Sequence, residues 1–453
     1  MFADLPAIVG KLTELRYNAK LTRAELEATK LKKFRKLAAK AEARSPYYRE
    51  IIKSRDIDVK TCKPADFPVL TKSDLMTNFD RIVTDRRVTK AALTDFLARS
   101  NDPRELFLGK YRVLRTSGTS GKMGIYVFST ADWMRGFLVS ATRMQGRAGA
   151  QGRRRRLALY GVTEGHFAGA SMATTFMQVP MRMFIKAEFF NIADPISQSC
   201  AKLNAFQPDL LTSYPSALAA LAERQLAGEL KIAPLAVAAS GETVTKADLQ
   251  VLQDAFKCDV GSSYSCSEHL LIGLSSEDNE TMTLFDNDLI FEFHDDHIIV
   301  TNLFNTTQPL IRYRMDDVLT PVKQSPGARE LVIRSVVGRS EYTPSFVNED
   351  GARDIINTHT ISTIFVDGVR QFQLRVTGEA SFEVLARLED GLSADASDVA
   401  ISGLRESIAG VLRQRRMSNV AFEVTAVDKI DHDPVSRKFK LIVDARRRGE
   451  AQS

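Results

Sequence analysis

The sequence has few cysteines and no long apolar run. Its four cysteines are far apart and form no C-x-x-C pair: Cys62, Cys200, Cys258 and Cys266. This spacing excludes a disulfide framework and predicts reduced thiols, as in cytoplasmic proteins. No stretch approaches the ~18 uninterrupted apolar residues of a transmembrane helix. Residues 1–10 lack the basic start and apolar run of a secretory signal. We therefore expect a cytoplasmic protein without membrane insertion.

A large excess of charge of one sign is also missing. Lysine and arginine number 62 against 56 acidic residues, which gives a net charge of +6. Two basic runs, at 153–156 and 446–448, are not interleaved with aromatic residues, so we expect solvated faces and no nucleic-acid partner. Cys266 and His269 are too few to form a metal site. With 44% hydrophobic and 26% charged residues, the composition is that of an ordinary soluble globular protein.

The length of 453 residues predicts two or three domains. Residues 1–105 are rich in Leu, Ala, Lys, Arg and Glu and predict a mostly helical lead-in. From about 110 to 265, short apolar strands alternate with helices. This alternation predicts an α/β sheet, largely parallel, with functional loops at the strand ends.

The pattern changes after about residue 280, where short β-type runs such as 310–313 follow one another. From about residue 340, a smaller unit mixes strands with a helix. We therefore expect an α/β fold of two domains. The large N-terminal domain, with mixed sheets and helices, would span 1–338, and a smaller, mobile α+β domain would span 339–453.

Residues 116–124 form a glycine-rich loop between two strand-like runs, with the sequence Thr-Ser-Gly-Thr-Ser-Gly-Lys-Met-Gly. Glycines let backbone N–H groups turn toward an anion, and the hydroxyls and the lysine add donors and a positive charge. The loop therefore predicts a polyphosphate cradle. It is not a Walker A loop, because Gly121-Lys122 is followed by Met123. From composition alone, a flexible Ser/Gly loop stays an equal alternative.

Further polar groups follow the later strands in a fixed order. They are Ser240-Gly241-Glu242, Ser263 to Glu268, Arg312 to Asp317, Gly338 to Glu341, and Pro434 to Lys440. Taken singly, each has a plain structural explanation. Glu268 beside His269 could be a surface pair, and the aspartates at 316–317 could form a structural ion-pair cluster with nearby arginines.

In this order the motifs resemble those of the adenylate-forming superfamily, in particular its phenylacetate–coenzyme A ligase branch and the capsule-associated relatives. The glycine-rich loop is similar to the SSGTTGKP-type phosphate loop of that family. The other matching segments are Ser45 to Tyr48 (NxPYY), Leu70 to Leu75 (LTKxDL), Tyr214 to Ser216 (the start of the acyl-pocket loop), Tyr264 to Glu268 (YGxSE), Arg312 to Asp317 (RYRTxD) and Gly338-Arg339 (GR). The resemblance covers about residues 45–440, and seven motifs in order are far more specific than any one of them.

The resemblance implies an ATP-dependent, magnesium-dependent ligase. A carboxylic acid would become an acyl-adenylate with release of pyrophosphate, and the acyl group would pass to a thiol of coenzyme A or of a carrier-protein phosphopantetheine. An aromatic acid is favoured by the family and by no residue in particular. Alternatives are an acyl-protein synthetase, an amide-forming enzyme, and a non-catalytic nucleotide-binding descendant. The oligomeric state stays open, with a homodimer as one alternative.

The resemblance also implies roles for single residues. Lys438, Glu268 and Lys122 would be catalytic, with Glu268 holding the Mg²⁺ ion. Asp317 would bind the ribose hydroxyls, and Arg339 would lie at the interdomain joint. The implied nucleotide-binding residues are Ser117, Gly118, Thr119, Ser120, Gly121, Lys122, Ser240, Gly241, Glu242, Ser263, Tyr264, Ser267, Asp317 and Arg339. The residues expected to border the acyl pocket are Tyr214, Phe167, Gly169 and Ala239.

Three positions depart from the family pattern. Met123 replaces a proline, and Ser265 replaces a glycine, so the backbone at 265 is less free. Arg437 replaces the glycine of the usual Gly-Lys pair. Lys438 is the expected catalytic lysine, and Lys440 is the alternative.

Overall fold

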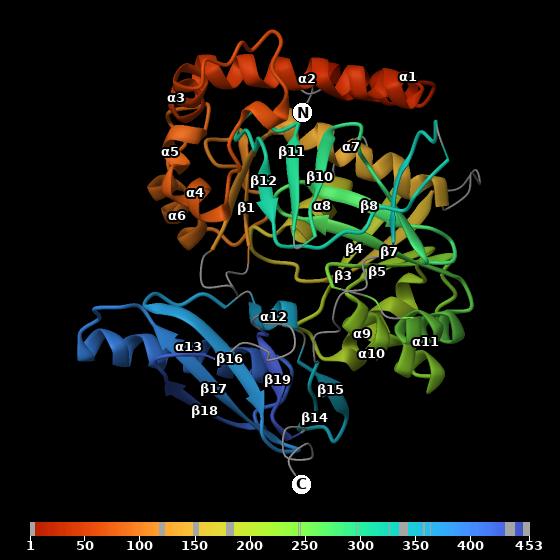
Figure 1. Cartoon of the computed structure of the whole chain (residues 1–453). Helices are drawn as coiled ribbons and strands as arrows, with labels where there is room; N and C mark the ends of the chain where they lie inside the picture. Colours follow the sequence, from red (N-terminus) through yellow and green to blue (C-terminus); the bar gives the residue numbers. More distant parts are fainter. Residues whose placement is uncertain are drawn as a thin grey trace.

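The computed structural model describes residues 5–116, 123–147, 154–177, 185–242, 244, 246–295, 297–325, 327–334, 343–356, 358–362, 364–430 and 440–446. Figure 1 shows a large part, formed by residues 5–334, and a smaller C-terminal part, formed by residues 343–446. Over the described residues, no helix is both long enough and apolar enough to cross a bilayer.

Six helices begin the chain, and the first two lie along one edge of the large part (Figure 1). Local sequence signals set their ends. Thr22 and Glu25 form a capping box at the start of α2, and Ser45 caps α3 with Pro46 in its first turn. The helices are α1 (Leu5–Asn18), α2 (Arg23–Arg44), α3 (Pro46–Ser54), α4 (Lys72–Thr77), α5 (Phe79–Ile82) and α6 (Lys90–Arg99), with a 3₁₀ turn at Pro64–Asp66.

Two small antiparallel sheets pack on these helices. One is the hairpin β1 (Tyr111–Arg115) and β2 (Ile125–Ser129), whose connection contains the glycine-rich loop. The other has the order β10 (Leu289–Phe293), β11 (Ile298–Asn302) and β12 (Tyr313–Met315). The expected β-run at 310–313 becomes a strand only at Tyr313, because Arg312 has a positive φ of 52° that interrupts extended backbone.

The central sheet has eight strands in the order β13-β9-β8-β7-β6-β5-β3-β4. Strands β3 to β7 run parallel, as expected for the alternating region, and β8, β9 and β13 are added antiparallel, so the sheet as a whole is mixed. The strands are β3 (Arg155–Gly161), β4 (Ile185–Asn191), β5 (Leu210–Ser213), β6 (Ala236–Ser240), β7 (Asp259–Cys266), β8 (Leu270–Ser275), β9 (Thr281–Leu284) and β13 (Leu331–Arg334).

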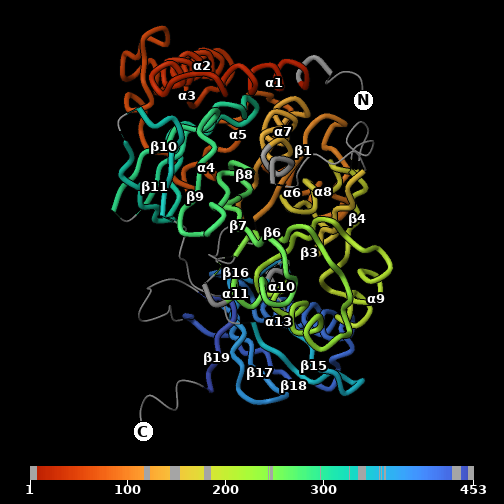
Figure 2. The backbone as a smooth tube through the Cα atoms, turned by 90° about the vertical axis from the view of Figure 1, so that its right-hand side faces the viewer, coloured from red at the N-terminus to blue at the C-terminus, as the bar shows by residue number. Residues whose placement is uncertain are grey.

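Helices connect and cover the parallel strands. They are α7 (Thr130–Arg147), α8 (Ala168–Phe176), α9 (Ile196–Phe206), α10 (Pro215–Leu226) and α11 (Lys246–Phe256). An apolar core lies between the parallel strands and α9, α10 and α11, and includes Leu203, Leu218 and Leu252. In Figures 1 and 2 these three helices form the side of the large part that is nearest to the C-terminal part.

The C-terminal part has its own hydrophobic core, built around residues such as Leu374, Val384 and Leu404. Its sheet has the order β18-β17-β16-β19, and the long helix α13 packs on it. Its elements are β14 (Ser345–Val347), β15 (Arg353–Ile355), α12 (Thr358–Ser362), β16 (Val369–Val376), β17 (Ser381–Leu388), α13 (Ala394–Gln414), β18 (Ala421–Ala426) and β19 (Ile442–Asp444). The expected fold class, a large α/β part followed by a smaller α+β part, is confirmed.

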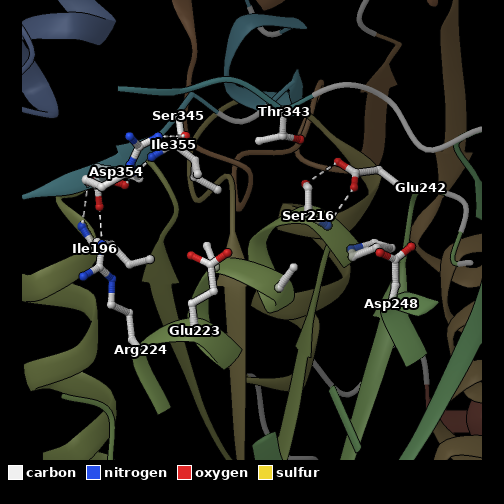
Figure 3. Close-up of a pocket in the computed structure, with 14 residues that line it drawn as sticks. Ile196, Ser216, Glu223, Arg224, Glu242, Asp248, Thr343, Ser345, Asp354 and Ile355 are labelled. Atoms are coloured by element: carbon white, nitrogen blue, oxygen red, sulfur yellow. Dashed lines mark hydrogen bonds between the residues drawn. The ribbon is translucent and has the colours of Figure 1, made fainter. Parts of the chain in front are cut away.

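A buried ion pair inside the C-terminal part lies at its contact with the large part. The guanidinium of Arg415, at the end of α13, lies 2.9 Å from Asp354 in β15, and both side chains are fully buried. Arg415 also donates to the backbone oxygen of Ile192 in the large part. Asp354 accepts a hydrogen bond of 3.0 Å from the backbone N–H of Ile196, in the first turn of α9 (Figure 3).

Candidate active site

The turn between β7 and β8 presents Glu268 beside the strand that follows the glycine-rich loop. The hydroxyl of Tyr126, in β2, donates a hydrogen bond of 2.7 Å to Glu268 Oε1. Burial and the charge of Glu268 raise the pKa of Tyr126 well above its ordinary value, so its phenol stays protonated as a donor. The hydroxyl of Tyr313, at the start of β12, lies 2.9 Å from that of Tyr126.

Lys72 brings a cation to the same place from the first turn of α4. Its Nζ donates to Thr116 Oγ1 at 3.3 Å. Burial lowers the pKa of Lys72, and the negative charge of Glu268 opposes this effect. Lys72 therefore lies within electrostatic reach of both Glu268 and the glycine-rich loop.

The two ends of the glycine-rich loop are tied together. The N–H of Thr116 donates to the oxygen of Gly124 at 2.9 Å, and the N–H of Gly124 donates to Thr116 Oγ1 at 2.8 Å. A side chain at position 124 would lie 2.9 Å from the Tyr126 hydroxyl and 3.0 Å from Lys72 Cε. Gly124 is therefore needed for the loop to pass close to both groups.

Asp317 lies on the segment after β12 and faces Tyr264 of β7. The Tyr264 hydroxyl donates to Asp317 Oδ2 at 2.8 Å, and burial with the nearby Asp317 charge raises the pKa of Tyr264. Asp316 instead faces solvent beside Arg314. Arg314 pairs with Asp316 at 3.2 Å, whereas Arg312 pairs with Glu292 at 2.6 Å, so the alternative of an ion-pair cluster at 312–317 forms only in part.

The segment 240–242 follows the end of β6. Ser240 Oγ lies 3.2 Å from Ser265 Oγ of β7, and Gly241 adopts a positive φ of 86° that favours glycine. The Glu242 carboxylate accepts hydrogen bonds from the N–H of Ser216 at 3.0 Å and from its hydroxyl at 2.9 Å. Glu242 therefore caps the first turn of α10, which fixes the loop that the sequence places near the adenine.

A cavity of about 420 Å³ lies beside this loop, between α10 and the strands β14 and β15. Figure 3 shows Glu242, which is directed toward Ser216, at one side of the cavity, and Asp354 at the opposite side. The cavity thus opens between the large part and the C-terminal part, next to the end of β6.

No protein-family model matches the chain. The whole molecule is similar to crystal structures of 2-hydroxyisobutyryl-CoA ligase. The structure of that ligase with 2-HIB-AMP and CoA in the thioesterification state gives a TM-score of 0.58 at 17% identity, over 96% of this chain and 94% of that one. The structure in the postadenylation state with R3-HIB-AMP gives a TM-score of 0.56 at 17% identity, over 95% of this chain and 92% of that one. The chain has the adenylate-forming fold.

A sequence relative agrees with this fold assignment. Protein CapK of Staphylococcus aureus is 22% identical over 309 residues, which are 65% of this chain. The match spans 64% of the length of CapK. The resemblance to the adenylate-forming superfamily is confirmed at the level of the fold.

Within the adenylate-forming fold, several predicted nucleotide contacts lie together at the carboxyl ends of the parallel strands, the usual ligand position in such sheets. Tyr264, Ser263 and Ser240 lie on adjacent β7 and β6, where Ser263 pairs with Ser240. Ser267 lies half-buried in the turn before Glu268. The residues Ser117, Gly118, Thr119, Ser120, Gly121, Lys122, Arg339 and Lys438 lie outside the described residues.

The four predicted acyl contacts fall in two places. Phe167 and Gly169 lie at the start of α8, where the Arg115 guanidinium is 4.9 Å from the centre of the Phe167 ring. Tyr214 precedes α10, and Ala239 is buried in the core between the sheet and α9, α10 and α11. Neither Tyr214 nor Ala239 lines the 420 Å³ cavity, and the acyl role of all four stays a prediction.

Cys266 and His269 form no metal site in the part of the chain that the structure describes, where no group of three or more possible ligands gathers. His269 is fully buried, and burial lowers its pKa to about 3. Its Nδ1 accepts a hydrogen bond of 3.3 Å from Asn302 Nδ2. Burial and the nearby Glu268 charge raise the pKa of the Cys266 thiol, so it stays neutral.

Sequence reasoning gave no role to Lys72, Tyr126 or Tyr313. Lys72 lies in the motif at 70–75 and Tyr313 in the motif at 312–317. Both motifs could be identified from the sequence, so these two residues could have been considered as site residues. Tyr126 had none, because its contact with Glu268 joins positions 142 residues apart.

Proposed function

We propose that the protein is an ATP-dependent ligase that activates a carboxylic acid as an acyl-adenylate. The observation that carries this proposal is the gathering of Glu268 and Lys72 at the ends of the glycine-rich loop in an adenylate-forming fold, with Asp317 held by Tyr264, which is also close to Glu268. A carboxylate oxygen of the acid would attack the α-phosphorus of ATP, and pyrophosphate would leave. Since both reactants are anions, cationic groups at this place lower the barrier.

Glu268 is suited to hold Mg²⁺ together with the phosphates of ATP. Magnesium in proteins is often bound by one or two carboxylates plus substrate phosphates, rather than by a cage of protein ligands. Glu268 supplies one such carboxylate, and no further ligand cluster surrounds it among the described residues. The ion, when bound, would neutralise part of the charge that develops on the phosphates.

Asp317 is suited to hold the ribose. One of its oxygens accepts from Tyr264, which fixes the carboxylate in place. A fixed carboxylate can accept hydrogen bonds from two adjacent hydroxyls. Tyr264 and the backbone of residues 240–242 would then border the adenine.

The remaining roles follow the resemblance. Residues 117–122 would bind the β- and γ-phosphates together with Lys72, and Arg339 would lie near the ribose at the joint. The division into a large domain at 1–338 and a lid domain at 339–453 is part of this proposal. The lid would bring Lys438 onto the carboxylate and the α-phosphate, and would then rotate to admit a thiol.

Coenzyme A is the first acceptor to test. Its thiolate would attack the acyl carbon, and AMP would leave. The likeness to a ligase solved with an acyl-AMP and CoA supports this choice. A carrier-protein phosphopantetheine stays the second acceptor, and an aromatic acid the favoured substrate class.

The proposal is tested by acid-dependent exchange of labelled pyrophosphate into ATP. We expect exchange with at least one acid from a panel of aromatic, hydroxylated and fatty acids, and thioester formation when CoA or carrier protein is added. Binding of Mg·ATP without exchange on any acid would favour the non-catalytic descendant instead.

Lys438 offers a sharper test within the same assay. The Lys438→Ala variant should lose acid-dependent exchange while its affinity for ATP, measured by calorimetry, stays unchanged. Lys440→Ala is the comparison variant, because Lys440 is the alternative catalytic lysine and its backbone oxygen, which accepts a hydrogen bond of 2.8 Å from Gln373 Nε2, is kept in the variant. Wild-type exchange in Lys438→Ala, with loss in Lys440→Ala, would move the catalytic role to Lys440.

A further inference from the structure

Tyr126 and Tyr313 form a buried chain of hydroxyl groups that ends on Glu268. Their side chains come from different sheets, β2 and β12, and both residues are almost without solvent exposure. The two rings meet edge to face, with centroids 6.4 Å apart. The hydroxyl oxygens lie 2.9 Å apart, and the last link to Glu268 Oε1 is 2.7 Å.

The direction of the hydrogen bonds in this chain follows from proton counting. An ionised carboxylate can only accept hydrogen bonds, so the Tyr126 hydroxyl uses its single O–H to donate a hydrogen bond to Glu268. The Tyr126 oxygen must then accept from Tyr313, whose proton points toward Tyr126. The chain thus runs from Tyr313 through Tyr126 to Glu268, and it occupies Oε1.

We infer that Tyr126 and Tyr313 are positioning residues that hold the Glu268 carboxylate ready for a metal–nucleotide complex. A glutamate has several rotatable bonds, and a fixed hydrogen bond on one oxygen selects one orientation. Among the described residues, no group donates a hydrogen bond to Oε2, which is left for a single-oxygen contact with the metal. The inference rests on the proposed function, because it presumes that Glu268 binds Mg·ATP.

Gly124 connects this chain to the glycine-rich loop. A methyl group there would lie 2.9 Å from the Tyr126 hydroxyl, which is closer than real contacts allow. The end of the loop therefore passes directly over the hydroxyl that orients Glu268. Contact of Tyr126 with both Gly124 and Glu268 therefore fixes the position of the Glu268 carboxylate relative to the end of the glycine-rich loop.

The competing explanation is that the tyrosines only fill the core. Tyr126→Phe keeps the ring and removes the oxygen, so it separates the two explanations. Tyr111→Phe is the matched control, since the Tyr111 hydroxyl also donates to a carboxylate, Asp85 Oδ2 at 2.6 Å, and Tyr111 is also buried.

The experiment measures metal binding rather than activity. At a fixed ATP concentration, the melting temperature is followed as Mg²⁺ is titrated, and the Mg²⁺ concentration at half-saturation is compared between variants. We expect Tyr126→Phe to raise this concentration about tenfold, as loss of outer-shell partners typically does. Tyr313→Phe should raise it less, and Tyr111→Phe should leave it unchanged.

ATP binding in the presence of EDTA should be the same in all three variants. Equal Mg²⁺ half-saturation in Tyr126→Phe and Tyr111→Phe would overturn the inference. Glu268→Gln separates this failure from that of the proposed function. If Glu268→Gln weakens Mg²⁺ binding and Tyr126→Phe does not, only the positioning role is wrong. If Glu268→Gln also leaves Mg²⁺ binding unchanged, Glu268 is not the metal ligand. The positioning role of the tyrosines and the proposed metal-binding role of Glu268 are then both wrong.

Discussion

Lys72 shows how a single side chain can join a site from a distant segment. It lies 44 residues before Thr116 in the sequence, yet its ammonium contacts that threonine at the edge of the glycine-rich loop. Burial lowers its pKa, which is the behaviour of a cation held away from water. A half-buried cation at this place is available to pair with a phosphate.

We predict that Lys72→Met weakens Mg·ATP binding about tenfold or more, since a hydrogen bond between charged groups contributes roughly 1.5–3 kcal/mol. Calorimetric titration with Mg·ATP checks this. Lys90→Met is the control and should leave the affinity unchanged. Lys90 is exposed, and among the described residues its ammonium donates to the backbone oxygen of Met76 alone. Equal affinities in Lys72→Met and the wild type would remove Lys72 from the nucleotide site.

Single residues differ in how far the sequence reveals them. Glu268 and Asp317 could be named from the order of the motifs, and the structure brings Tyr264 within reach of both. Tyr126 could not be named, because a phenol in an apolar strand looks like core until its partner is known. The Glu242 carboxylate caps α10, a contact that the sequence did not indicate, and the predicted role of the 240–242 backbone stays a prediction.

The helices α1 and α2 are held on the large part by charges as well as by apolar contacts. Lys11 and Lys33 both pair with Asp288, which lies between β9 and β10, and Lys11 and Asp288 are buried. Burial opposes the charge on Asp288, but the two lysines outweigh it and hold the pKa of Asp288 at about 2. A carboxyl whose pKa is depressed in the folded state stabilises the fold above its unfolded pKa.

We therefore predict that Asp288→Asn lowers the free energy of unfolding by about 3 kcal/mol at neutral pH. The reason is that, among the described residues, it leaves the buried Lys11 and the half-buried Lys33 with only the half-buried Glu14 as a carboxylate partner. The stabilisation by Asp288 should be lost as the pH falls from about 4 to 2. Urea unfolding at several pH values checks both statements. Asp390 forms an exposed pair with Arg370, and Asp390→Asn should lower the free energy of unfolding by less than about 0.5 kcal/mol. A difference between wild type and Asp288→Asn that does not shrink at low pH would contradict the assignment.

Elements were predictable where local pattern decides them. The strands that became β1 and β2 and the alternation through β7 follow from apolar runs and turn residues. The antiparallel strands β8, β9 and β13 could not be foreseen, because their addition to the parallel sheet depends on partners far along the chain. The run at 310–313 is interrupted as a strand at Arg312, which has a positive φ and whose side chain pairs with the distant Glu292.

Across the whole molecule, the fully buried Arg415–Asp354 pair of the C-terminal part contacts the large part at Ile192 and Ile196. Both side chains have no solvent exposure, and Asp354 also accepts from the N–H groups of Ile196 and Ile355. Removing one partner of such a pair leaves an uncompensated charge in the interior.

We predict that Arg415→Met speeds hydrogen exchange at the amides of Ile196 and Ile355, as the joint loosens. Exchange followed by mass spectrometry or NMR checks this. Arg413→Met, at the same end of α13 but in an exposed pair with Glu406, should leave these amides protected. Unchanged protection in Arg415→Met would show that apolar contacts alone hold the two parts together.

This pair also limits how the C-terminal part can move. Any swing of the C-terminal part away from α9 must break the hydrogen bonds from Arg415 to the Ile192 oxygen and from the Ile196 N–H to Asp354, and must move this charged pair out of a dry interior. Intermediate positions are therefore costly, and the molecule should occupy two discrete arrangements with few copies in between. In single-molecule distance measurements, such a protein would give two separate peaks instead of one broad distribution.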